Sequence, residues 1–340
     1  MKILLWHVHG GWTTSFVQGE HEYLLPLLPE GGPWGGGRMG RDWPAAAREV
    51  PVDRLADEHV DVVVLQRTEE PELVRRWLGK TPGEDVAAVF VEHNTPKGDV
   101  PRTRHPFADR PDLLIAHVTH FNELMWDTGT TPTTVVEHGI VDPGHRYTGE
   151  LARAAVSVNE PVRRWRVTGT DLFPRFADAV PLDVFGMGCD SLGDAVGLGP
   201  DRLRVVGDLP TDRLHAEMAR RRVYLHTVRW TSLGLSLLEA MHLGIPVVAL
   251  GVTEAARAVP PEAGVLSTRV DDLVDALRAV AADPARAAEM GARAREFALA
   301  RFGLRRFLRR WDDVLAVVAS GDAAVTSGNA LARSGNGVSA

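Results

Sequence analysis

Glu239 is the residue whose surroundings point most directly to chemistry. It is the only carboxylate in the run 232–246, where most other residues are apolar. This run lies between two short apolar segments, 223–226 and 247–250, and ends in glycine and proline, which predicts a helix between two strands. Apolar residues on every side predict that the helix is buried all round.

A buried carboxylate without partners is costly and tends to take up a proton, so Glu239 needs hydrogen-bond donors. Two ribose hydroxyls would supply them. An exposed Glu239, or one paired with a nearby arginine, is the alternative.

The start of the same helix is suited to an anion such as a diphosphate. Backbone N–H groups in the first turn have no partner within the helix, and the helix dipole favours negative charge there. The candidate binding residues are Thr231, Ser232, Leu233, Gly234 and Leu235.

Residues 237–248 resemble the family 4 glycosyltransferases, whose pattern is Glu, seven residues, Glu, then Ala-Met-x-x-Gly-x-Pro-Val-Val. Glu239 matches the second glutamate, which binds ribose in that family, and Thr231 stands where the first glutamate would contact the sugar ring. The resemblance extends over most of the chain. It implies a retaining enzyme with the GT-B fold, an α/β architecture of two facing Rossmann-like domains with parallel sheets.

A basic cluster follows the apolar run 154–158. It contains Arg163, Arg164 and Arg166. Guanidinium groups bind phosphate in bidentate fashion, so the cluster suits a diphosphate, although a solvated basic turn is the alternative. The family has Arg, four residues, then Lys-Gly at this point; Gly169 matches the glycine, and Thr168 replaces the lysine.

Three further segments are candidates for contacts with substrate. His93 follows the apolar run 86–91, at the strand end where open α/β sheets bind ligands, and in similar enzymes such a histidine meets the reacting sugar. Gly10 and Gly11 follow the first strand and resemble a glycine-rich opening loop, where backbone can approach a ligand closely. Leu209 lies in a segment resembling the one that covers the nucleobase. A loop histidine and a plain strand-to-helix turn are the alternatives for the first two.

Short β-rich runs separated by helical stretches predict parallel sheets. The ten runs are 3–8, 62–65, 86–91, 113–116, 135–136, 154–158, 184–187, 203–206, 223–226 and 247–250. They divide into two Rossmann-like halves. The predicted boundaries are 1–148 for an acceptor-side domain, 149–302 for a nucleotide-sugar domain, 303–319 for a C-terminal helix returning to the first domain, and 320–340 for a disordered tail. The glycine-rich stretch 31–40 predicts a mobile surface loop.

Composition excludes several classes of protein. The chain has 340 residues and a formal net charge of -7, which argues against a nucleic-acid binder. The chain has a single cysteine, Cys189, and shows neither a secretory leader nor an apolar run long enough to cross a bilayer. These features predict a cytoplasmic protein. The aromatic residues of the basic stretch 301–311 are expected to pack in the core. Peripheral contact of this stretch with an anionic membrane is the alternative. No Cys/His metal spacing and no Asp-x-Asp occur, so we expect a metal-independent protein without a cofactor.

These observations predict a hexosyltransferase-type glycosyltransferase. It would transfer a sugar from a nucleoside-diphosphate sugar to an unknown acceptor with retention of configuration, and Thr231 and His93 are its catalytic candidates. A nucleotide-sugar epimerase or hydrolase on the same fold, and a catalytically silent binding protein, are the alternatives. The sequence leaves the sugar, the nucleobase, the acceptor and the oligomeric state open.

Overall fold

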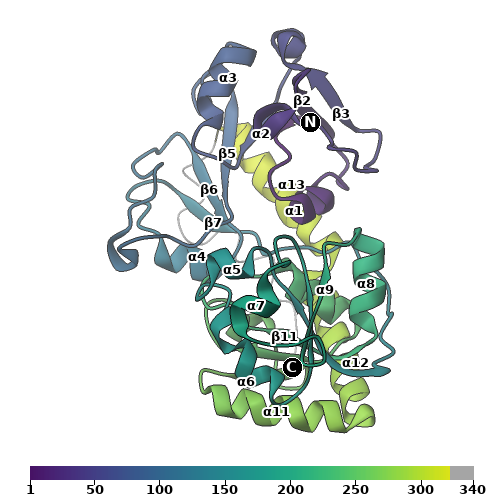
Figure 1. The fold of residues 1–340 in the computed structure, drawn as a ribbon. Helices are drawn as coiled ribbons and strands as arrows, with labels where there is room; N and C mark the ends of the chain where they lie inside the picture. Colours follow the sequence, from purple (N-terminus) through teal and green to yellow (C-terminus); the bar gives the residue numbers. More distant parts are fainter. Residues whose placement is uncertain (322–340) are drawn as a thin grey trace, which may run out of the picture. The chain divides into compact units, whose positions relative to one another are not determined.

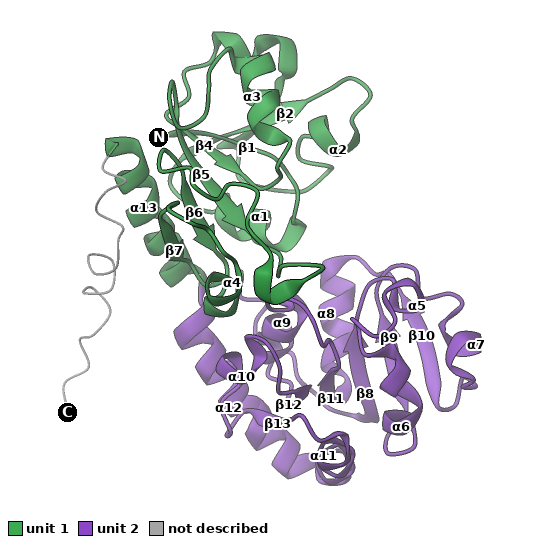
Figure 2. Cartoon of the chain, turned by 90° about the vertical axis from the view of Figure 1, so that its left-hand side faces the viewer, with its two compact units in different colours: residues 1–141, 304–340 green, residues 142–303 purple. Residues whose placement is uncertain are grey.

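The computed structural model describes residues 1–321, and the chain divides into two compact units (Figure 2). Unit 1 contains residues 1–141 and the segment from residue 304 onward, and unit 2 contains residues 142–303. The first boundary lies earlier than the predicted 148/149. The reason is that the backbone N–H groups of residues 146–149 bond to the carbonyls of Leu243 and Ala219 in unit 2. The tail beyond residue 321, predicted to be disordered, lies outside the described residues.

Unit 1 is built on a seven-stranded sheet in the order β3-β2-β1-β4-β5-β6-β7, with every pair parallel (Figure 1). Its strands are β1 (Lys2–Leu5), β2 (Glu22–Leu27), β3 (Ala47–Pro51), β4 (Val62–Leu65), β5 (Ala87–Glu92), β6 (Leu114–His117) and β7 (Thr133–Val135). Its helices are α1 (Gly10–Phe16), α2 (Gly32–Gly35), η1 (Val52–Asp57), α3 (Glu70–Leu78), η2 (Val100–Arg102), α4 (His120–Met125) and α13 (Leu304–Ser320).

Unit 2 is built on a six-stranded parallel sheet in the order β10-β9-β8-β11-β12-β13. Its strands are β8 (Leu151–Ser157), β9 (Leu182–Phe185), β10 (Leu203–Gly207), β11 (Arg221–His226), β12 (Val247–Leu250) and β13 (Gly264–Ser267). Its helices are α5 (Pro161–Arg164), η3 (Thr170–Leu172), α6 (Phe173–Ala177), α7 (Leu192–Val196), α8 (Thr211–Ala219), α9 (Leu235–Leu243), α10 (Ala255–Ala258), α11 (Val270–Ala282) and α12 (Pro284–Phe302).

The predicted fold class, an α/β chain with two parallel sheets, is confirmed. Each of the ten predicted runs overlaps a strand, and the structure adds β2, β3 and β13. Two of the added strands break the apolar pattern: β2 contains Pro26, and β3 carries Arg48 and Glu49. In both sheets the strand order reverses beside a central pair, β1/β4 in unit 1 and β8/β11 in unit 2. Open α/β sheets bind ligands beyond the carboxyl ends of such a pair.

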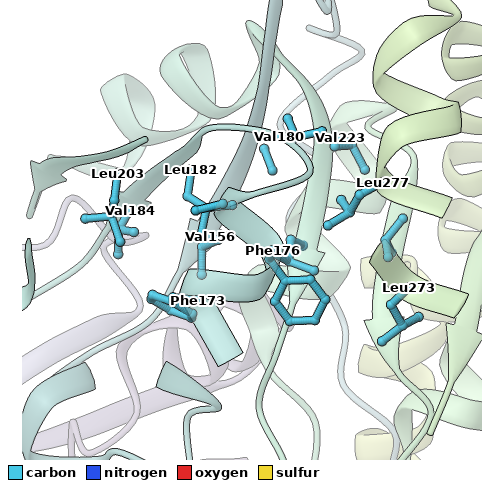
Figure 3. Close-up of a cluster of buried hydrophobic side chains, with 14 of the residues drawn as sticks. Val156, Phe173, Phe176, Val180, Leu182, Val184, Leu203, Val223, Leu273 and Leu277 are labelled. Carbon is cyan, nitrogen blue, oxygen red and sulfur yellow. The ribbon is translucent and has the colours of Figure 1, made fainter. Parts of the chain in front are cut away.

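The core of unit 2 lies between its sheet and the helices α6 and α11 (Figure 3). Phe173 and Phe176 from α6 and Leu273 and Leu277 from α11 are fully buried against valines of the strands. In unit 1, α13 buries Phe307 and Trp311 against α1, and the ring centroids of Trp12 and Trp311 lie 5.6 Å apart. The aromatic residues of 301–311 therefore pack in the core, as the sequence indicated. None of the described helices combines the length and the apolar character that a bilayer crossing demands.

The glycine-rich stretch 31–40 differs from the expected mobile surface loop because it is fastened to unit 1. The indole N–H of Trp6 donates to the carbonyl of Trp34 at 3.0 Å, and the N–H of Gly37 donates to the carbonyl of Pro26 at 3.1 Å. The N–H of Arg38 donates to the Glu49 carboxylate at 2.7 Å. The glycine-rich composition of this stretch does not reveal these hydrogen bonds.

A buried ion-pair cluster holds the strands of unit 2 together at the edge of the sheet where they begin. Asp183 is fully buried and accepts from Arg153 Nε at 2.6 Å, from Arg221 Nε at 2.8 Å and from Arg204. Burial opposes ionisation of Asp183, but the three guanidinium groups outweigh it and lower the pKa of that carboxyl below its usual value. Because Arg221 is also buried, neither side chain can turn to solvent if the other is lost.

Replacing Asp183 with asparagine is expected to lower the free energy of unfolding by about 3 kcal/mol, because the buried guanidinium of Arg221 loses one of its two carboxylates and keeps only Glu217. Urea unfolding measures this loss. Since the folded pKa lies below the unfolded value of about 3.9, the stabilisation is present at neutral pH and is lost as the pH falls through the folded pKa. Asp178→Asn is the matched control, because its pair with Arg202 is exposed and contributes about 0–1 kcal/mol. Equal losses in both variants would contradict the assignment.

Candidate nucleotide-sugar site

Two loops leave the central strand pair of unit 2 and meet. The loop after β8 runs from 158 to 170, and the loop after β11 runs from 227 to 234. The N–H of Arg229 donates to the carbonyl of Val167 at 2.8 Å, and the Thr227 hydroxyl donates to the carbonyl of Thr168 at 2.7 Å. The two loops therefore form one continuous rim at the point where the strand order reverses.

Gly169 is required where the loops touch. Its φ of +74° is unfavourable for other residues, and a Cβ at this position would lie 2.1 Å from the carbonyl oxygen of Thr227. Two neighbours also have backbone conformations unusual for side chains of their size, with φ of 52° at Glu160 and 31° at Trp165. Strain of this kind costs about 1–3 kcal/mol per residue and gathers at ligand-binding loops.

The predicted arginine cluster is present on this rim, and the structure adds Arg229, which the sequence analysis missed. Arg163 pairs with Glu160, and Arg166 pairs with Asp171 at 3.1 Å. Arg229 Nη2 donates to the same Asp171 at 2.9 Å. Arg164 makes no ion pair with any residue in the described part of the chain. Four arginines against two carboxylates leave the rim positively charged.

Thr168 is fully buried inside the loop. Its hydroxyl donates to the carbonyl of Trp165 at 3.0 Å and lies 2.9 Å from the hydroxyl of Thr170. This side chain is therefore occupied in holding the loop and does not extend from it. The positive charge of this loop comes from the neighbouring arginines.

The sequence analysis expected α9 to be buried all round, and the structure differs. Leu235, Ser236 and Glu239 form a half-buried stripe along one side, whereas the remaining residues of the helix are buried. The Glu239 side chain is 21% exposed, and His215 Nε2 lies 3.7 Å from its carboxylate. Because the stripe begins with a leucine, apolar periodicity alone could not reveal the open side.

The residues before α9 are arranged around its open start. Gly234 is the N-cap and has no side-chain cap, and a Cβ there would lie 2.9 Å from the ring of the buried His226. Ser232 and Leu233 are buried, and Thr231 is half-buried with a hydroxyl that makes no hydrogen bond within residues 1–321. Leu209 is half-buried after β10. The loop with the predicted arginines is therefore bonded to the loop that leads into α9, the helix that carries Glu239.

In unit 1, His93 follows β5 and lies in a buried group of histidines. Its ring centroid is 4.1 Å from that of His9 and 5.2 Å from that of Trp12. Burial holds the pKa of His93 well below its usual value, with the charges of His9 and His138 acting in the same direction. The imidazole is therefore neutral at physiological pH.

Gln66 fixes the tautomer of this imidazole. The Gln66 amide nitrogen donates to the carbonyl of Trp6 at 2.8 Å, so its oxygen accepts from His93 Nε2 at 3.0 Å. Nε2 therefore carries the proton, and Nδ1 keeps a free lone pair. Gly10 and Gly11 begin α1 directly after His9, which places them near His93 at the carboxyl edge of the sheet.

Comparisons with known proteins support the prediction of a glycosyltransferase-type enzyme. Residues 151–313 match the family model described as glycosyl transferase-like. No curated protein sequence matches the chain.

Solved structures show the fold. Sucrose-phosphate synthase from Thermosynechococcus elongatus is similar with a TM-score of 0.70 and 14% identity, over 94% of this chain and 99% of that chain. HepE from Anabaena in complex with UDP gives a TM-score of 0.69 and 14% identity, over 93% and 100%. The pneumococcal O-GlcNAc transferase GtfA in complex with UDP and GlcNAc gives 0.55 and 15%, over 76% and 56%. The chain therefore has the GT-B fold of glycosyltransferases.

Replacing Arg163, Arg164 and Arg166 together with glutamine is expected to weaken binding of UDP by at least about tenfold, because guanidinium groups bind phosphate through charge-assisted bonds. Binding of uridine should change little, since it has no phosphate. Calorimetry with both ligands makes the comparison internal. A triple variant of Arg269, Arg278 and Arg293, which are exposed elsewhere on unit 2, removes the same charge and is the control. Equal losses for UDP and uridine would mean that the cluster acts through folding.

Proposed function

We propose that this protein is a glycosyltransferase that transfers a hexosyl group from a nucleoside-diphosphate sugar to an acceptor with retention of configuration. One observation carries the proposal. The loop that carries Arg163, Arg164 and Arg166 bonds to the loop that carries Arg229 and leads into α9, the helix of the half-buried Glu239. All of these residues lie within 151–313, the segment that matches the glycosyl transferase-like family model, which supports the proposal.

Each group has a distinct part in the proposal. The arginines and the N–H groups at the start of α9 bind the diphosphate and stabilise the negative charge that grows on it as the sugar leaves. Glu239 accepts hydrogen bonds from the two ribose hydroxyls, and Leu209 covers the nucleobase. Positioning of the acceptor and stabilisation of the leaving group account for the rate, without a protein nucleophile.

The charge of the diphosphate is neutralised by arginines in this proposal and not by a divalent ion. Within residues 1–321 no group of three or more histidine, cysteine, aspartate or glutamate side chains is arranged to hold a metal ion. The two related structures of HepE contain UDP and UDP-glucose, so uridine donors are the first to test. Activity that persists in a chelator is the expected result.

Glu239→Ala is expected to weaken UDP binding by about 1–3 kcal/mol, the scale of hydrogen bonds to a charged group. Titration calorimetry on the folded variant measures the loss. Glu289→Ala removes a carboxylate from an exposed position of α12 and should bind UDP like the unmodified protein. Unchanged affinity in Glu239→Ala would overturn the assignment to ribose.

His93→Ala is expected to reduce turnover by about 100-fold with little change in UDP affinity, because His93 belongs to unit 1 and its neutral imidazole acts on the reacting sugar. Thr231→Ala should reduce turnover only modestly, since its hydroxyl replaces a carboxylate and transfer still rests on the arginines. Steady-state kinetics with a UDP-sugar measure both, and the thermal midpoint checks that each variant is folded. The opposite order of effects would reverse the two roles. Tight binding of UDP-sugar without release of UDP would instead favour a silent binding protein.

A further inference from the structure

The central strand pair of unit 1 has its own unassigned group of basic and polar side chains. The loop after β1 carries His7 and His9, the loop after β4 carries Gln66 and Arg67, and the β2–β3 connection, residues 28–46, carries Arg41. Strands β1 and β4 are adjacent and parallel, and the strand order reverses between them. The edge that binds ligands in such sheets is therefore flanked by two arginines.

Arg67 is held in place with one donor unused. Its Nε donates to Glu70 at 2.7 Å, its Nη1 donates to the carbonyl of Pro33 at 2.6 Å, and its guanidinium lies 4.0 Å from the ring of Trp34. Its Nη2 is buried and has no acceptor within the described residues. A buried donor without a partner is costly, so this atom calls for an acceptor.

Arg41 lies against the loop after β1. One of its terminal nitrogens is 3.1 Å from the position that a Cβ on Gly10 would occupy, so a side chain at residue 10 would crowd it. No carboxylate pairs with Arg41 in the part of the chain that the structure describes. The backbone of Arg41 is fixed, because its carbonyl accepts from Arg38 Nε at 3.1 Å.

The charge around this edge is positive. Burial lowers the pKa of His9 to about 4, with a further contribution from Arg67, and burial together with Arg41 lowers the pKa of His7. The histidines are therefore neutral, and within residues 1–321 the only carboxylate bound to either arginine is Glu70, whose pKa is raised by burial to about 7. The glycine-rich connection thus adds Arg41 to this edge, and Glu70 is the one carboxylate there that pairs with either arginine within the described residues.

We propose that Arg41 and Arg67 form an anion-binding subsite beside Gly10, and that the acceptor of the reaction carries a phosphate or carboxylate group that binds there. The assignment of the ligand as an acceptor rests on the proposed function, whereas the subsite itself does not. Both guanidinium groups present planar donors suited to such oxygens. Arg41 is exposed, so its guanidinium can reach a ligand, and a purely structural role would leave Arg67 with an unused buried donor.

Titration of the full-length protein with inorganic phosphate and with acetate tests the subsite. Both titrations are made in saturating UDP, so that the arginine cluster of unit 2 is occupied. Saturable binding of an anion is expected, and Arg41→Gln should weaken it by about tenfold or more. Stronger binding of phosphate assigns a phosphorylated acceptor, and stronger binding of acetate assigns a carboxylate acceptor. Absence of saturable binding of either ion overturns the proposal.

Two controls distinguish the subsite from a general effect of surface charge and from the donor site. Arg76→Gln removes a charge from an exposed position of α3 in the same unit and should bind phosphate like the unmodified protein. UDP affinity should be the same in Arg41→Gln and the unmodified protein. A loss of UDP affinity would mean that Arg41 serves the donor and would overturn the subsite.

Arg67→Lys tests the second arginine with its charge retained, and weaker phosphate binding with an unchanged thermal midpoint is expected. If UDP itself fails to bind, the proposed function fails, and phosphate titration without UDP still decides the subsite.

Discussion

The close approach of Gly169 to the carbonyl of Thr227 is the constraint on which the site of unit 2 depends. It lets the loop after β8 and the loop after β11 bond to each other through backbone atoms. The sheet then positions the two loops that carry the arginines and the helix start.

The departure at Thr168 follows from the same constraint. A lysine would place its charge at the contact between the loops, whereas the buried threonine uses its hydroxyl to hold the turn. The positive charge then comes from arginines that project from the turn. Since Asp171 binds both Arg166 and Arg229, one carboxylate orients two guanidinium groups and still leaves the rim with net positive charge.

The sequence predicts well what depends on local pattern. Buried parallel strands are short apolar runs, so all ten predicted runs fall on strands, and the helix carrying Glu239 has the expected glycine end. Features that depend on contacts between distant segments could not be predicted. Three such features are the open side of α9, the bond of Arg229 to Asp171 and the hydrogen bonds that hold residues 31–40. The spacing of residues in the sequence reveals none of them.

The histidines of unit 1 show how one buried amide can set the chemistry of a site. A neutral imidazole has one donor and one acceptor nitrogen, and which is which follows from its neighbours. Because Gln66 uses its own N–H on the carbonyl of Trp6, its oxygen must accept from His93, and the free nitrogen of His93 must be an acceptor. A ligand that reached the free nitrogen of His93 would therefore have to donate a hydrogen bond to it. A protonated imidazole would lose that acceptor, and it would also have to overcome the burial that keeps the ring neutral.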